Sequence, residues 1–227
     1  MIQIEVDTRE EIRAIAQQLG NLSDQAPEIL RLSINAAARK VRKGIVKEVG
    51  DTYTIKPKIL KDRKKGAPTV TTAKPGTLGA IIRSKGPYND LIDFMTRPSN
   101  AGVKVKVLQS SALRTLEVDN AKAFITRFSA GNVSEGQTSE GHIAVVQRQP
   151  GQTYTMRGAQ KRIEKYGYPH RGAWPDLTRI KKLLGPAVPS MMQNEDIQLQ
   201  ARDTLNTVLQ EEIEKRIRKT MRNGGVT

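Results

Sequence analysis

The sequence contains no cysteine, which excludes a disulfide scaffold and any metal site built on thiolates. Aromatic residues are scarce, at 4%, so we expect a modest core and some stabilisation by neighbouring subunits. No stretch approaches the roughly 20 apolar residues of a membrane span. The first residues also lack the basic and apolar regions of a secretion signal. The sequence therefore predicts neither a membrane protein nor a disulfide-stabilised secreted protein.

Residues that usually carry catalysis are also scarce. The chain has two histidines, His142 and His170, and neither lies in the spacing of a zinc site. The glycines of residues 131–136 are spaced as in a phosphate-binding loop, but the essential lysine is missing. Acidic residues are scattered singly or lie in the first turns of predicted helices. The sequence therefore predicts a protein that is not an enzyme and has no cofactor or metal.

Basic residues are abundant and unevenly distributed. Lys and Arg number 38 against 23 Asp and Glu, which gives a formal net charge of +15. Residues 31–65 carry 12 cations against three acids, and residues 157–182 carry eight against two. Such a balance favours an anionic partner, which could be nucleic acid, an anionic membrane or an acidic protein surface.

Six of the 12 cations of residues 31–65 lie on a predicted helix that Ser23 or Asp24 caps and Gly50-Asp51 ends. Its apolar residues recur every three or four positions, at Leu30, Ile34, Ala37, Val41, Ile45 and Val49. Five basic residues, which we call the basic helix residues, lie off this stripe: Arg39, Lys40, Arg42, Lys43 and Lys47. Two interpretations stay open, a solvated face that contacts acidic neighbours and a surface that contacts DNA phosphates.

The remaining pattern predicts an α+β fold in which a small antiparallel sheet or sandwich is packed by two long amphipathic helices. Near the N-terminus we expect a strand at 2–6 and a helix that Gly20 stops. The residue pattern in the middle of the chain predicts strands at 77–84, 103–107, 123–128 and 143–147, with a loop at 96–102. The terminal helix is capped near Asn194, and its apolar stripe comprises Ile197, Ala201, Leu205, Val208, Leu209, Ile213 and Ile217.

We expect one domain over residues 1–227, with candidate arms at 129–141 and 150–175. The first arm is polar and glycine-rich, and the second interrupts every regular pattern. Tyr166, Tyr168 and Trp174 lie in the second arm beside basic residues. Stacking aromatics beside cations would suit single-stranded nucleic acid, but we favour an arm that packs on a neighbouring subunit.

Residues 180–192, the docking segment, combine apolar side chains with Gly185, Pro186 and Pro189, which forbid a continuous helix. A stiff apolar segment of this kind is typical of a docking element, because its prolines reduce the entropy lost on binding. We expect Leu184, Val188 and Met191 to be buried, either within the subunit or on the next one. The candidate docking residues are Leu183, Leu184, Pro186, Val188, Pro189 and Met191, together with the three aromatics of the second arm.

The order of these elements resembles the bacteriophage minor tail protein Z family. A small-residue basic helix at 32–49 leads into Tyr53-Thr-Ile-Lys-Pro-Lys, and a strand at 141–148 and the docking segment follow. The resemblance spans about residues 32–218. Its most specific piece is Leu184-Gly-Pro-Ala-Val-Pro-Ser-Met191.

The resemblance implies a structural virion protein, a tail-completion or neck subunit at the head-proximal end of the tail that is needed for head–tail joining. It implies a homo-oligomeric ring, six subunits as in related tail-completion proteins, present in the host cytoplasm during assembly. The implied neighbours are tail-terminator or tail-tube proteins, head-connector proteins and genomic DNA in the channel, with no membrane. The alternative is a non-specific DNA-binding protein that uses the basic helix residues, and a nuclease with clustered acids around a metal is a third hypothesis.

Overall fold

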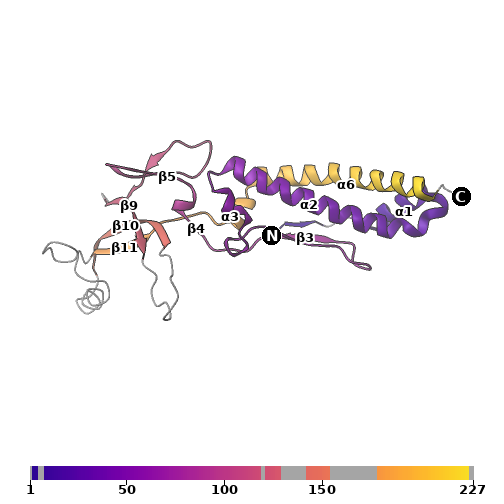
Figure 1. The fold of residues 1–227 in the computed structure, drawn as a ribbon, viewed down its shortest axis with the longest axis horizontal. Coiled ribbons are helices and arrows are strands. Elements are labelled where there is room, and N and C mark those ends of the chain that lie inside the picture. Colours follow the sequence, from indigo (N-terminus) through magenta and orange to yellow (C-terminus); the bar gives the residue numbers. More distant parts are fainter. Residues whose placement is uncertain (1, 5–7, 119–120, 129–141, 154–177, 225–227) are drawn as a thin grey trace. The chain divides into compact units, whose positions relative to one another are not determined.

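The computed structural model describes residues 2–4, 8–118, 121–128, 142–153 and 178–224. Within the single domain that the sequence predicts, the chain divides into two compact units. Unit 1 comprises the ranges 1–88 and 186–227, and unit 2 comprises 89–185 (Figure 1). The predicted α+β class is confirmed, with small antiparallel sheets and long helices toward both ends of the chain. Unit 2 is inserted between the two parts of unit 1.

Three helical elements open unit 1. They are α1 (Thr8–Leu19), the 3-10 turn η1 (Gly20–Gln25) and α2 (Ala26–Thr52). Gly20 ends α1 as predicted, with a φ of +55° in the left-handed region that favours glycine. The predicted cap at Ser23 or Asp24 is wrong, because both residues lie inside η1, which runs directly into α2. Gln25, the residue before α2, has helical dihedrals and makes no side-chain cap.

The terminal helix α6 (Glu195–Gly224) returns antiparallel to α2 (Figure 1). Its predicted cap is confirmed, since the Asn194 Oδ1 atom accepts a hydrogen bond from the Asp196 N–H at 3.0 Å. Every predicted stripe residue of α2 is buried, and those of α6 are buried or half-buried. Ile29, Leu30 and Ile34 of α2 join Leu209 and Ile213 of α6 in one apolar core.

A three-stranded antiparallel sheet in the order β1-β3-β2 also belongs to unit 1. Its strands are β1 (Ile2–Ile4), β3 (Ala80–Arg83) and β2 (Thr69–Thr71), of which β2 is not predicted from the sequence. The buried Asn35 side chain joins α2 to the chain after β2. Its amide donates to the Ala73 carbonyl at 3.1 Å, and its Oδ1 atom accepts from the Ala73 N–H at 2.7 Å. One side chain thus satisfies both backbone groups of Ala73.

Replacing Asn35 by alanine is expected to lower the free energy of unfolding by about 2–4 kcal/mol. The change leaves the N–H and carbonyl of Ala73 without partners in a buried place, and each such group costs about 1–3 kcal/mol. Urea unfolding measures the effect. Arg39→Ala, an exposed change on the same helix, should stay within about 0.5 kcal/mol. Equal stability of Asn35→Ala and the wild type would show that the two hydrogen bonds are unimportant.

Two short helices lie at the far end of α2 from η1. The helix α3 (Pro57–Lys61) buries Ile59 and Leu60 and leads into the 3-10 turn η2 (Arg63–Lys65). Residues 57–65 thus form a short helix and turn rich in basic residues. The second short helix, α5 (Val188–Met192), packs against α2 and carries Pro189 in its first turn, where a missing N–H is tolerated.

Unit 2 consists of small antiparallel sheets. One has the order β11-β10-β9-β8, with β8 (Glu117–Val118), β9 (Ala121–Phe128), β10 (His142–Thr153) and β11 (Thr178–Lys182). A second has the order β5-β6-β7, with β5 (Met95–Ser99), β6 (Gly102–Lys106) and β7 (Arg114–Thr115). All four strands that the sequence predicts in the middle of the chain are present, with shifted ends.

Two features of these strands differ from the sequence prediction. Residues 96–99 belong to β5 rather than to a loop. These residues lack the alternation of apolar and polar side chains because β5 is an edge strand with mostly exposed residues. Pro98 is tolerated on such an edge strand. The strand β10 also continues past Pro150 to Thr153, with a register shift and a Gly151 φ of +74°. The irregularity that ended the predicted strand is a bulge within it.

The two ends of unit 2 are paired with each other. The strand β4 (Asn89–Asp90) opens the unit, β12 (Leu184–Gly185) closes it, and the two are antiparallel neighbours. An ion pair between Lys182 Nζ and Asp90 Oδ1 at 2.6 Å reinforces the pairing. A Cβ atom on Gly185 would lie 2.5 Å from the buried Phe94 ring, so the close approach requires glycine.

Replacing Gly185 by alanine is therefore expected to destabilise unit 2 by about 1–3 kcal/mol, the usual cost of overpacking. Thermal unfolding followed by the near-ultraviolet signal measures the loss. Gly79→Ala is the matched control, because a Cβ atom there meets nothing within 4 Å. Unchanged stability of Gly185→Ala would refute the account of the Phe94 contact.

Candidate functional surfaces

The basic helix residues all lie on the exposed part of α2, as the sequence predicts, but they are not equivalent. The Lys40 Nζ atom lies 2.8 Å from Glu212 Oε1 of α6. The Lys47 Nζ atom lies 3.2 Å from Asp51 and 3.9 Å from Glu48. Two of the five cations are thus engaged with carboxylates of their own chain.

Arg39, Arg42 and Lys43 form no ion pair with any residue that the structure describes. Arg39 lies three and four residues from Arg42 and Lys43, so these cations are neighbours on the helix surface. Like charges in such positions repel slightly. An anionic partner would relieve that repulsion.

Glu212 is a buried carboxylate held by two cations. Lys40 contacts one oxygen, and the Arg216 guanidinium lies 3.6 Å from the other. The hydrogen bond from Lys40, with the nearby positive charges, lowers the pKa of Glu212 despite the opposing effect of its burial. The same hydrogen bond raises the pKa of Lys40. The pair therefore links α2 to α6 across the edge of the apolar core.

Glu212→Gln is expected to lower the free energy of unfolding at pH 7 by about 1–3 kcal/mol, the range for hydrogen bonds to charged groups. The folded-state pKa of this carboxyl is below its ordinary value of 4.5. The contribution should therefore be complete above pH 4.5 and disappear as the pH falls through the folded-state pKa. Denaturant unfolding of the wild type and the variant is measured at pH 7 and at pH 3. The difference between their free energies of unfolding should be smaller at pH 3.

Glu214→Gln is the matched control, because Glu214 forms an exposed ion pair with Arg218 at 2.8 Å on the same helix. Exposed pairs contribute at most about 1 kcal/mol. A stability difference for Glu212→Gln that stays constant between pH 7 and pH 3 would contradict the electrostatic explanation.

The docking segment has a mixed environment. Val188, Met191 and Met192 are buried within unit 1, and Pro186 and Pro189 are half-buried. Leu184, in contrast, is 50% exposed, so it is not buried within its own subunit. The reason is strand alternation: Gly185 takes the buried position of β12, and the preceding side chain points to the other face. Docking of the segment on a neighbouring subunit stays a prediction.

A further basic surface lies around α3. Its residues are not among the site residues predicted from the sequence. We define the α3 basic surface as Lys58, Lys61, Arg63, Lys64 and Lys85, all of which are exposed. The high local charge of residues 56–65, six cations against Asp62, could have singled it out. The continuous apolar stripe of α2 is a stronger sequence signal than the short α3.

The backbone under the α3 basic surface is tightly fixed. A Cβ atom on Gly86 would lie 2.6 Å from the Lys65 carbonyl and 2.7 Å from the Gly66 Cα atom. The Ser84 hydroxyl donates to the Gly66 carbonyl at 2.5 Å. Gly66 itself has a φ of +98°, and a Cβ atom there would lie 3.1 Å from Pro189 of the docking segment. The docking segment thus packs beneath this surface within unit 1.

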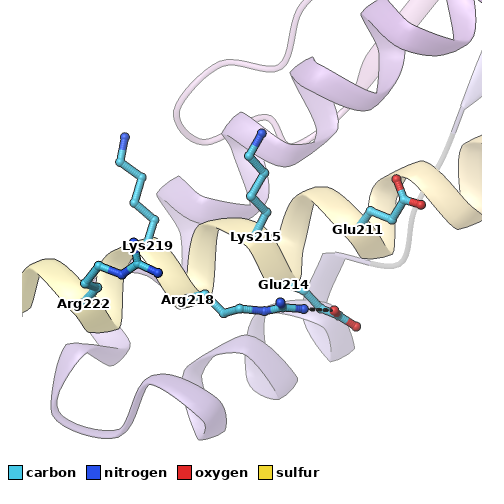
Figure 2. Close-up of a pocket in the computed structure, with 6 residues that line it drawn as sticks. All are labelled: Glu211, Glu214, Lys215, Arg218, Lys219 and Arg222. Atoms are coloured by element: carbon cyan, nitrogen blue, oxygen red, sulfur yellow. Dashed lines mark hydrogen bonds and ion pairs between the residues drawn. The ribbon is translucent and has the colours of Figure 1, made fainter.

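An open pocket of about 440 Å³ lies along the C-terminal half of α6 (Figure 2). Its lining residues are Glu211, Glu214, Lys215, Arg218, Lys219 and Arg222. Figure 2 shows the Glu214–Arg218 ion pair running along the helix, whereas the side chains of Lys215 and Lys219 extend away from it. Ligand pockets are normally concave and mostly apolar, whereas these walls are long charged side chains of one helix. We interpret the pocket as the solvated face of α6.

The remaining candidate residues are the two histidines, the three aromatics of the second arm and the arms themselves. His142 begins β10 and is exposed. His170, Tyr166, Tyr168 and Trp174 lie outside the described residues, as do the arm at 129–141 and most of the arm at 150–175. Among the residues that the structure describes, no three His, Asp or Glu side chains gather as metal ligands. No described helix is long and apolar enough to cross a bilayer.

Comparisons of the chain with models of protein families, with curated proteins and with solved structures found no match.

Proposed function

We propose that this chain is a structural virion protein of a tailed bacteriophage, a tail-completion or neck subunit that forms a ring where the tail joins the head. The observation that carries the proposal is the resemblance of residues 184–191, in the order Leu-Gly-Pro-Ala-Val-Pro-Ser-Met, to the minor tail protein Z family. The basic helix and the strand at 141–148 precede this segment in the same order as in the family.

The geometry of the docking segment supports the proposal. Gly185 is required by the Phe94 contact, and Val188 and Met191 anchor α5 in unit 1. Leu184 remains as an exposed apolar side chain on the paired strand β12 of unit 2. An exposed leucine on a paired strand is suited to contact a neighbouring subunit, because the pairing already orders its backbone before binding.

The proposal is tested with a phage that encodes this chain. Particles made without the chain should appear as filled heads and complete tails that are not joined, and the wild-type chain supplied in trans should restore joined particles. Electron microscopy counts the joined fraction. Joined, infectious particles in the absence of the chain would refute the neck role.

The same complementation tests the docking residue. Leu184→Asp should reduce the joined fraction several-fold, because a charge placed in an apolar interface is costly. Leu199→Asp is the matched control, a 61% exposed leucine on α6 outside the docking segment, and should behave as the wild type. Normal joining with Leu184→Asp would remove the docking role and leave the neck role standing.

A second candidate function is non-specific DNA binding through α2. The observation that favours it is the set of Arg39, Arg42 and Lys43, which pair with no described residue. Removing these three charges should then abolish most duplex binding by the purified chain.

A further inference from the structure

The α3 basic surface concentrates positive charge in a short stretch of chain. Lys58, Lys61, Arg63 and Lys64 lie within seven residues, so their backbones stay within about 20 Å even for an extended chain. Lys85 joins them, because Gly86 packs directly on the backbone of residues 65 and 66. Five exposed cations therefore share one fixed part of unit 1.

These cations are not neutralised within the described chain. The acid within residues 56–66 is Asp62, and its Oδ1 atom accepts a hydrogen bond from the Lys64 backbone N–H at 2.9 Å. None of the five cations forms an ion pair with a residue that the structure describes. The surface thus keeps its charge available, unlike Lys40 and Lys47 of α2.

The surroundings of the surface favour a polyanion over a protein partner. Residues 56–66 and 84–87 are all described, and none of them is an exposed large apolar side chain. Protein interfaces usually depend on buried aromatic or aliphatic anchors, and residues 56–66 and 84–87 supply none. Duplex DNA carries one charge per about 1.7 Å of axis, so a surface of at most about 20 Å lies along at most about 12 phosphates. Tyr88, 65% exposed and three residues after Lys85, adds a ring that could stack on an unpaired base.

We propose that the α3 basic surface is a binding site for the phosphodiester backbone of nucleic acid. Its five cations contact phosphates without reading base sequence. Ile59, Leu60, Gly66 and Gly86 hold the backbone that presents them. Binding through five phosphate contacts should give a plot of log K against log salt with a slope of about −4.5.

The test measures fluorescence anisotropy of a labelled 30-base-pair duplex and of the single strand of the same sequence, titrated with the full-length chain between 20 and 300 mM salt. The site variant is Lys58→Gln/Lys61→Gln/Lys64→Gln. The matched control is Arg202→Gln/Lys219→Gln/Arg222→Gln, which removes the same charge from exposed positions of α6. Melting temperatures of both variants should equal that of the wild type, since the substituted side chains are exposed.

We expect the site variant to bind at least tenfold more weakly at low salt, with a salt slope smaller by about 2.7, whereas the control stays close to the wild type. A preference for the single strand that Tyr88→Ala removes would assign unpaired nucleic acid as the ligand. Equal binding of both forms, insensitive to that change, would assign the duplex backbone. Both results would support a phosphate-binding site on the α3 basic surface.

Three results would overturn the inference. They are no binding by the wild type at 20 mM salt, an unchanged slope for the site variant, and equal losses for the two triple variants. Displacement of the duplex by poly-L-glutamate as efficiently, charge for charge, as by unlabelled duplex would also overturn it, and would indicate an acidic protein partner.

The inference assigns a surface that the neck proposal does not use. Nucleic-acid binding is measured on the purified chain, whereas the neck role is tested by counting heads joined to tails. Either can therefore fail while the other stands.

Discussion

The packing of α6 on α2 is the contact on which unit 1 depends. The two helices are separated in sequence by the whole of unit 2, so their pairing closes a very long loop of chain. Burial of Ile213, Ile217 and Leu209 against Ile34 and its neighbours contributes about 1.5–3 kcal/mol for each large side chain. Loop-closure entropy grows only slowly with length, so a continuous apolar stripe can offset it.

At the edge of that packing lies a polar contact, between Glu212 and Lys40. A buried carboxylate without a partner would destabilise the helix pair, because a charge in an apolar place is costly. Lys40 reaches it from the half-exposed side of α2 at 2.8 Å. One of the cations that the sequence suggested for an external partner is therefore occupied by the fold itself. Charge on a helix predicts a partner but does not say whether that partner is internal.

The other end of α2 has a different character. There α3, η2 and α5 are short, and close glycine contacts act together with buried apolar side chains, Ile59 and Leu60 of α3 and Met191 of α5, in setting their arrangement. Gly86 lies on the backbone of Lys65 and Gly66, and Pro189 covers Gly66 from the docking segment. A backbone fixed in this way can present several cations without pairing them. The physical link between the docking segment and the α3 basic surface is this layer of close backbone contacts.

Sequence periodicity predicted the long helices well, because each carries an uninterrupted apolar stripe over many turns. It also predicted the strands whose faces alternate, such as β6 with buried Val103 and Val105. It missed β2, which has only three residues, and β5, whose residues are mostly exposed. The exposure of Leu184 depends on the pairing of β12 with β4, almost 100 residues away in sequence. No local pattern contains that information.

The neck role connects the resemblance of the docking segment with a chain rich in basic residues and exposed interaction surfaces. Its most direct test is an image of the intact particle in which the chain carries a visible label at a terminus. We predict a ring of label at the junction of head and tail, surrounding the channel. Label found along the tail tube, at the distal tip or absent from the particle would contradict the proposal.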